Sequence, residues 1–208
     1  MASIERSPQV SAASPSRWKV LATRPFRVLR RLLTCKPLRS GPGPSGTSWC
    51  RERLAPYCQG YGLDLGFGGD PITAQAIRMD MPTPYTHVGE FPVQLGGDAT
   101  NLYWFREGVL DFVYSSHLLE DFPDTKAVLR EWLRVLKPKG RLIIFCPDEQ
   151  RYRAHCQKTG DTYNTHHQQT NFSLDSVLDA LRDIGQYRVL HSDPAVHDYS
   201  WELVIEKQ

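Results

Sequence analysis

The sequence predicts an α/β protein built on a mostly parallel β-sheet. Short apolar segments rich in β-branched residues alternate along the chain with segments of helical periodicity, as expected where helices connect parallel strands. Several strand candidates end in glycine, serine or aspartate, which is typical of sheets that bind ligands at the carboxyl ends of their strands. Two strand-like segments follow one another at the C-terminus, and this succession predicts an antiparallel pair.

The N-terminal part differs in composition from the rest of the chain. Residues 1–16 are small and polar and are predicted to be disordered. Within 17–35, the segment after Pro25 has leucines on one helical face and arginines largely off it, which predicts a short basic amphipathic helix. Residues 1–50 carry nine Lys or Arg against one acidic residue, so the remainder of the chain is net acidic.

A stretch rich in Pro, Gly and Ser separates this part from the segments of regular periodicity. It spans residues 37–47 and is predicted to be a linker. We therefore expect two parts: an N-terminal extension with its linker over 1–47, and a single folded domain over 48–208. A chain of 208 residues is long enough for one such domain with an appendage.

The elements of the folded domain follow from local patterns. The predicted strands are, in order, 62–65, 76–81, 91–97, 110–116, 140–147, 187–193 and 200–207. The fourth is mostly apolar, which indicates burial on both faces, and the fifth is a continuous apolar and β-branched run. Helices are predicted over 124–136 and 173–185, each with a single apolar stripe, and a short helix is predicted to begin at Ser48. Residues 148–172 are predicted to form a long polar loop.

Bulk properties exclude several classes of protein. The formal net charge of +2 is too small for a chain that binds nucleic acid as a whole. The five cysteines are odd in number and show no Cys-x-x-Cys spacing, which favours a reducing compartment, and so a cytoplasmic protein, over a disulfide framework. No apolar run approaches the 18 or so residues of a membrane span. In a eukaryote, the basic N-terminus would also suit organelle targeting.

The stretch GLDLGFGGDPI, 62–72, is the strongest candidate for a cofactor loop. A dinucleotide fingerprint needs a third glycine at a fixed spacing after Gly66 and Gly68, and Pro71 occupies that position. The acidic Asp64 inside the strand, two residues before the first glycine, is also foreign to that fingerprint. NAD binding is therefore the weaker hypothesis.

The same stretch resembles the D-x-G-x-G motif of class I S-adenosylmethionine (SAM)-dependent methyltransferases. Further resemblances follow in the family's order: Asp80 at the end of the second strand, GDATNL with Asp98 at the end of the third, and 110–145, which is similar to the methyltransferase-11-like group. The resemblance covers about residues 56–208. It implies a Rossmann-like sheet with an antiparallel C-terminal pair, SAM as cofactor and methyl transfer as the reaction.

The resemblance also assigns the residues that would bind SAM. By it, Asp64 lies near the methionine end, Asp80 accepts from both ribose hydroxyls, and Asp98 accepts from the adenine amino group. The others implied are Gly66, Phe67 and Gly68 in the loop, the amide of Ala99, and Ser115 at the tip of the fourth strand. Carboxylates suit a cofactor with a sulfonium and an ammonium group, and glycines let the backbone approach it. A helix cap or a solvated loop acid is the alternative for each aspartate.

Two departures from the family pattern are visible. The interval from Gly69 to Asp80 is too short for the usual helix between the first two strands, and 82–101 shows no helical stripe. Both predict a sheet with one thinly covered face. The basic N-terminal helix is a candidate to cover it.

Methyl transfer depends mainly on alignment of acceptor, methyl group and sulfur, and an oxygen or nitrogen acceptor can also need a base. The candidate bases are His117 at the end of the fourth strand and, in the 148–172 loop, Asp148, His155, His166 and His167. For each histidine the alternative is a hydrogen-bonding or positioning residue. A metal site is not expected, because adjacent His-Cys and His-His pairs do not match zinc ligand spacings.

The acceptor itself is not specified by the sequence. With no separate substrate domain, we expect a small or medium-sized molecule, which includes glycan-type and lipid-type acceptors, and no nucleic-acid partner. Residues 17–35 can dock on the sheet or contact an anionic membrane or a polyanionic substrate. The rival hypothesis is a SAM-binding pseudo-enzyme that acts as a protein-interaction module.

Overall fold

The computed structural model describes residues 44–84 and 91–208, which build one seven-stranded sheet in the order β3-β2-β1-β4-β5-β7-β6. These residues lie within the second of the two compact units of the chain, Gly41–Gln208. β1 to β5 pair in parallel, and β7 is inserted antiparallel between β5 and β6. The predicted α/β class and the antiparallel C-terminal pair are therefore confirmed. The predicted basic helix after Pro25 lies outside the described residues.

The strands overlap all the predicted segments, but β5 begins earlier, at Leu136, β6 extends further, to Val196, and the third strand is shorter. Their bounds are β1 Gly62–Leu65, β2 Ile77–Asp80, β3 Leu95–Gly96, β4 Leu110–Ser116, β5 Leu136–Pro147, β6 Tyr187–Val196 and β7 Ser200–Lys207. β4, β5 and β7 lie at the centre, and most of their residues are buried. The third strand has only two residues, because 91–94 does not pair along the edge as predicted.

The helices include one that the sequence analysis missed. Their bounds are α2 Gly46–Leu54, α3 Thr125–Val135, α4 Glu149–Thr159 and α5 Leu174–Arg182, with short 3-10 turns η1 Ala55–Tyr57 and η2 Leu119–Asp121. The prediction of a loop throughout 148–172 was wrong, since α4 occupies its first half. That helix is mostly polar, so it lacks an apolar stripe, but its Asp148 cap and its Gly160 stop were visible in the sequence.

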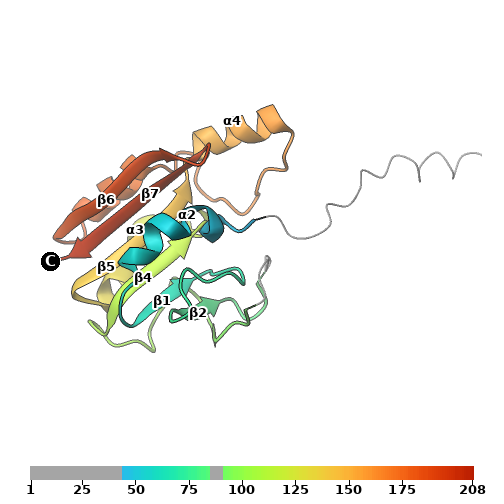
Figure 1. Cartoon of the computed structure of the whole chain (residues 1–208). Coiled ribbons are helices and arrows are strands. Elements are labelled where there is room, and N and C mark those ends of the chain that lie inside the picture. Colours follow the sequence, from blue (N-terminus) through green and yellow to red (C-terminus); the bar gives the residue numbers. More distant parts are fainter. Residues whose placement is uncertain (1–43, 85–90) are drawn as a thin grey trace, which may run out of the picture. The chain divides into compact units, whose positions relative to one another are not determined.

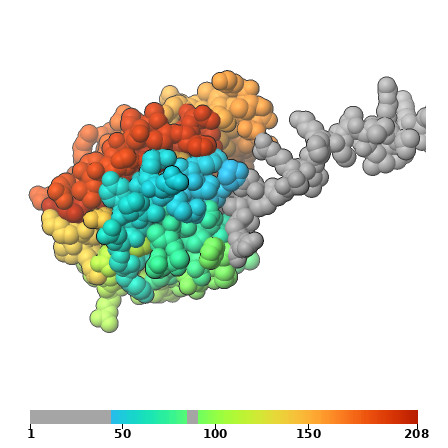
Figure 2. All heavy atoms as spheres, viewed as in Figure 1, coloured from blue at the N-terminus to red at the C-terminus, as the bar shows by residue number. Residues whose placement is uncertain are grey.

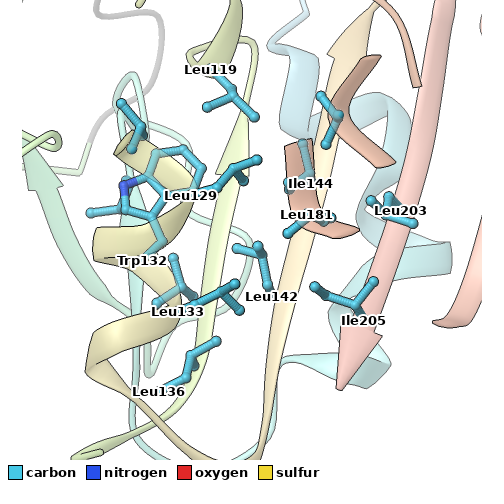
Figure 3. Packing of buried hydrophobic residues seen from close by; sticks show 14 of the residues in the cluster. Leu119, Leu129, Trp132, Leu133, Leu136, Leu142, Ile144, Leu181, Leu203 and Ile205 are labelled. Carbon is cyan, nitrogen blue, oxygen red and sulfur yellow. The ribbon is translucent and has the colours of Figure 1, made fainter. Parts of the chain in front are cut away.

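One face of the sheet is covered by α3 and α5 and holds the larger core (Figure 3). Leu129 and Trp132 of α3, together with Leu181 of α5, pack on Leu142 and Ile144 of β5, and all five side chains are fully buried. The spacing of these helical residues is that of a single apolar stripe. The predicted apolar stripes of α3 and α5 are therefore the faces that pack on the sheet.

The opposite face is covered by α2, which crosses the sheet in front of its central strands (Figure 1). Cys50 and Leu54 of α2 pack with Ile72 and with Phe112 and Phe145 of the sheet. Among the described residues, the element that covers this face is thus the short helix expected merely to lead into the domain. The N-terminal helix had been the predicted candidate, and it lies outside the described part.

The β1–β2 and β2–β3 connections contain no helix in their described residues, as predicted from the short first interval and from the missing helical stripe in 82–101. The chain between Gly66 and Ala76 makes turns only, and the edge formed by β2 and β3 stays short. No helix in 44–84 or 91–208 is long and apolar enough to span a bilayer.

Candidate functional site: a crevice at the carboxyl ends of the strands

Two adjoining cavities lie where β1, β2 and β4 end, and they share Gly66, Asp80 and Leu118 as walls. The first has a volume of about 270 Å³ and also lies against Trp49 of α2 and His117 after β4. The second has a volume of about 680 Å³ and reaches from β2 to the segment that follows β3. The glycine-rich loop therefore stands between two compartments of one crevice, at the sheet edge where α/β proteins bind ligands.

The two loop glycines hold backbone conformations that L-residues rarely adopt. Gly66 has φ +65° and Gly68 has φ +57°. A Cβ on Gly66 would come within 2.9 Å of the Leu118 side chain, whereas a Cβ on Gly68 would meet nothing closer than a carbonyl oxygen at 4.0 Å. Gly66 is therefore needed for packing within the protein, and Gly68 presents bare backbone to the first cavity.

Asp64 lies beneath the loop and is fully buried. Its Oδ2 accepts a 2.6 Å hydrogen bond from the amide of Ile72, while its Oδ1 has no hydrogen-bond partner among the described residues. Burial raises the pKa of this carboxyl well above its usual value. Asp64 lines neither cavity. Its hydrogen bond to the Ile72 amide instead holds the backbone of the loop that follows β1.

Asp80, the last residue of β2, lies on the boundary between the cavities. Its Oδ2 accepts from the amide of Gly68 at 3.2 Å, and its Oδ1 accepts from the amide of Met81 at 2.8 Å. The β1–β2 connection that leads to this residue is too short for a helix. The carboxylate nevertheless borders both compartments, because β2 pairs directly with β1.

The far end of the second cavity is bordered by Asp98 and Ala99. Asp98 is exposed, and its Oδ1 accepts from both the amide and the hydroxyl of Thr100 at 2.8 and 2.7 Å. The Ala99 carbonyl accepts a 2.8 Å hydrogen bond from the indole of the buried Trp132. The core of the α3 face therefore fixes the position of this wall.

The N-terminal turn of α2 forms a wall that the sequence did not reveal. Gly46 packs so closely on the site that a Cβ there would come within 2.8 Å of the His117 ring and of the Ser116 hydroxyl. Asp70 of the glycine-rich loop accepts from Ser45, the N-cap of α2, and forms an ion pair with Arg51. These contacts link the start of α2 to the glycine-rich loop. Figure 2 shows residues 44–58 lying between the C-terminal strands and the loop region.

His117 lines the first cavity from the end of β4. Its φ of +50° is unusual for a residue other than glycine, and its amide donates to the Phe145 carbonyl at 2.9 Å. Burial lowers the pKa of His117 to about 3, and the neighbouring His167 and His197 act in the same direction, so the ring is neutral at physiological pH.

Two serines at the end of the same strand point to opposite faces. Ser116 lines the first cavity. Ser115 instead donates to the carbonyl of Leu65 at 3.2 Å and is fully buried. Ser115 is therefore outside the lining of both cavities, although it had been predicted at the methyl-donor side, because side chains alternate along a strand.

The other predicted bases are spread over separate environments. Asp148 caps α4 by accepting from the amide of Arg151, and His155 lies on α4 against the ring of Tyr199. His166 is exposed and borders the second cavity. Neither Asp148 nor His155 lines either cavity. The contiguous polar loop implied by the sequence is thus divided by α4.

His167 belongs to a buried polar network behind the site. Its Nδ1 lies 2.8 Å from Oε2 of Glu149, which is fully buried. Oε1 of Glu149 accepts from Arg153 and from the Tyr163 hydroxyl, both at 2.5 Å. One buried carboxylate is thus paired with one guanidinium, which is the condition under which a charge is tolerated in a protein interior.

Glu120 connects this network to His117, and the sequence analysis overlooked it. The residue is 1% exposed, and its Oε1 lies 3.7 Å from Nδ1 of His117 and 3.8 Å from Nε2 of His167. It follows His117 by three residues in SSHLLED, a spacing that could have drawn attention to it. Nothing in the sequence, however, brings His167 to the same place.

Comparison with known proteins was consistent with this geometry. Residues 45–144 match the family model for a methyltransferase domain, and a search of curated proteins found no match. Similar solved structures include a SAM-dependent methyltransferase, possible histamine N-methyltransferase, from Thermotoga maritima, with 16% identity over 78% of this chain and 91% of that chain and a TM-score of 0.57.

Two further structures show how widely the fold is used. A SAM-dependent methyltransferase from Archaeoglobus fulgidus has 14% identity over 77% of this chain and 94% of that chain, with a TM-score of 0.57. The [4+2]-cyclase SpnF has 18% identity over 77% of this chain and 79% of that chain, with a TM-score of 0.53. At such identities the likeness establishes the fold alone. Residues 45–144 thus match the methyltransferase-domain family, and the described sheet has the class I methyltransferase fold.

Proposed function

We propose that the protein transfers a methyl group from SAM to a small or medium-sized acceptor bound in the first cavity. The observation that carries the proposal is the pair of cavities that share Gly66, Asp80 and Leu118. An elongated cofactor that spans both compartments would pass over the glycine-rich loop. Its reacting end would then lie beside His117 and the first turn of α2.

The residues of the crevice fit SAM. Gly68 offers a backbone without a side chain at the cavity wall, and the Asp80 carboxylate stands where a diol between the compartments could donate to it. Asp98 and the amide of Ala99 would hold the adenine at the far end of the second cavity. When bound, SAM supplies the methyl group. The protein would contribute alignment and the exclusion of water.

The acceptor side is small and partly aromatic. Trp49, Tyr199 and Asn164 border the first cavity together with His117, and its volume of about 270 Å³ lies just below the usual range for ligand pockets. This size favours a small molecule, or one end of a larger one, over a folded macromolecule. The neutral His117 ring is the base we propose for an acceptor that carries a proton.

A pair of glycine substitutions tests the cofactor site. Gly68→Ala places a methyl group in the cavity at a φ of +57°, and Gly108→Ala imposes the same kind of backbone strain at a φ of +65° where a Cβ meets nothing within 4 Å. Because the strain is matched, both variants should lose similar stability. We expect Gly68→Ala to weaken S-adenosylhomocysteine binding at least tenfold by calorimetry and Gly108→Ala to leave it unchanged. Equal affinities in both variants would refute the site.

Transfer itself requires a second measurement. Incubation of the wild-type chain with SAM labelled on the methyl group and with fractionated pools of small molecules, glycans and lipids should label a fraction of low molecular mass. Tight SAM binding without transfer to any pool would favour the pseudo-enzyme that acts as an interaction module. Labelling of the same fraction by an Asp80→Asn control that no longer binds SAM would show that the labelling is adventitious.

A further inference from the structure

The strongest feature that the proposed function leaves unexplained is a row of buried polar side chains running from Arg153 on the surface to His117 at the first cavity. Its order is Arg153, Glu149, His167, Glu120 and His117. Apart from Arg153, these side chains are largely buried, and the two carboxylates are at most 1% exposed. A second buried carboxylate without a cation of its own would be costly.

The hydrogen-bond roles in this row can be assigned from its outer end. Glu149 forms an ion pair with Arg153, and a carboxylate can only accept, so Nδ1 of His167 donates to it. In its neutral form, which the NMR experiment below tests, His167 then offers only a lone pair at Nε2, the atom 3.8 Å from Glu120. The partner of that lone pair has to be a donor.

Glu120 can be that donor only if its carboxyl carries a proton. Burial raises the pKa of Glu120 to about 8, and the nearby Asp121 and Glu149 also raise it. The titratable groups facing it come from every side: His117 and Asp121 along the chain, Cys146 on β5, Glu149 on α4, and His167 in the loop after α4. The Glu120 backbone and the Cys146 thiol act to lower this pKa, but burial outweighs them. By distance and angle, neither carboxyl oxygen makes a hydrogen bond to a described residue.

We propose that Glu120 is a positioning residue whose protonated carboxyl donates to His167 and accepts from Nδ1–H of His117, which leaves Nε2 of His117 free as a proton acceptor. The inference deepens the proposed function and rests on it for its role in catalysis. The distances of 3.7 and 3.8 Å are slightly longer than hydrogen bonds, as is common before substrate binds. Nε2 of His117 is buried and has no partner among the described residues, so the protein leaves its lone pair unused.

The row also accounts for the fate of the proton. When the acceptor gives its proton to Nε2 of His117, the electron pair of the broken O–H or N–H bond stays on the acceptor atom that forms the new bond to carbon. The Nδ1 proton of His117 then passes to Glu120, and the Glu120 proton passes to Nε2 of His167. The resulting imidazolium lies beside the Glu149 carboxylate, which stabilises it.

Long-range ¹H–¹⁵N NMR on the full chain at neutral pH tests the assignment without any cofactor or acceptor. We expect His117 and His167 to be neutral and protonated at Nδ1, and we expect infrared spectroscopy to show a protonated carboxyl band that disappears in Glu120→Gln. A glutamine can both donate to His167 and accept from His117, so this variant should keep both tautomers. Glu120→Ala should move the His117 proton to Nε2, the form that predominates for imidazole in water.

Glu202→Gln is a matched control, because Glu202 is also fully buried and lies 3.0 Å from a histidine, His191. It should alter the signals of His191 and leave those of His117 and His167 unchanged. A proton on Nε2 of His117 in the wild type, or no protonated carboxyl band, would overturn the proposal. If Glu120→Ala does not fold, the wild-type and Glu120→Gln spectra still decide it.

The cofactor site is tested separately from this network. Glu120→Gln should bind S-adenosylhomocysteine as tightly as the wild type does. If the predicted tautomers are found but the wild type binds neither SAM nor its product, the proposed function fails and the assignment of the row stands. If the cofactor binds and His117 carries its proton on Nε2, the positioning role of Glu120 fails alone.

Discussion

Trp49 of α2 stacks on His197 in the turn between β6 and β7, with ring centroids 3.9 Å apart and planes inclined by 11°. The contact joins a helix near the beginning of the domain to a hairpin near its end. His197 and Asp198 both have positive φ, so the turn is held in a strained form. Since Trp49 also lines the first cavity, this stack closes one side of the crevice.

Trp49→Ala should therefore release the first turns of α2. An offset aromatic pair contributes about 0.5–1.5 kcal/mol beyond its buried area, so we expect faster amide hydrogen exchange within 46–54 at little cost to global stability. Trp104→Ala removes a half-exposed indole that packs against Tyr103 in a tilted arrangement away from α2, and it serves as the control. Unchanged exchange in α2 would show that the stack does not hold the helix.

Asp70→Asn should loosen the attachment of the glycine-rich loop to α2. The substitution weakens the acceptor of both Ser45 and Arg51, and because the pair is partly exposed we expect a loss of only about 1 kcal/mol in the free energy of unfolding. Asp179→Asn breaks an exposed ion pair within α5 and should cost close to nothing. Urea denaturation of both variants measures the difference, and equal losses would contradict the anchoring role.

Trp132→Phe, a substitution in the core, should alter the position of Ala99 in the wall of the second cavity. It removes the 2.8 Å hydrogen bond to the Ala99 carbonyl, and we expect a loss of about 1–3 kcal/mol in stability together with severalfold weaker S-adenosylhomocysteine binding. Trp201→Phe removes a similar 3.0 Å hydrogen bond to Pro147. That control should be equally destabilised in thermal unfolding but should retain its affinity, whereas parallel loss of affinity in both would indicate a global effect.

The stability of the wild type should depend on pH through Glu120. The folded protein raises the pKa of this group from 4.5 to about 8, so folded chains hold its proton more tightly than unfolded chains do. Its contribution is complete below pH 4.5 and is lost as pH rises toward 8. Glu120→Gln cannot lose that proton. The variant should therefore gain stability relative to the wild type as pH rises from 5 to 8, as measured by urea denaturation at each pH.

Other titrating groups make the comparison between the two proteins essential. The lowered pKa of His117 acts in the opposite sense, because it contributes stability above its unfolded pKa of about 6.5 that is lost as pH falls toward 3. That term is common to both proteins and largely cancels in the difference. A difference in the free energy of unfolding that is flat between pH 5 and 8 would mean that Glu120 is ionised in the folded protein.

Local sequence patterns were sufficient for much of the fold. The alternation of apolar segments with the α3 and α5 stripes predicted the order of the elements, and β4 was predicted with its observed bounds Leu110–Ser116. These patterns work because burial on a sheet and on a helix imposes different periods on nearby residues. The glycine-rich loop was visible for a related reason, since positive φ at Gly66 and Gly68 restricts residue type.

What the sequence could not determine was which distant residues meet. By itself it determined the mostly parallel sheet, the glycine-rich loop and the carboxylates at the strand ends, all of which depend on neighbours a few residues apart. Only the tertiary structure decided that α2 covers the sheet face and lines the crevice, and that Glu120 lies between His117 and His167. Their proximity depends on how the loop after α4 lies against η2, where the Gln168 amide donates to the Glu120 carbonyl at 3.0 Å, and long-range packing leaves no periodic trace in one sequence.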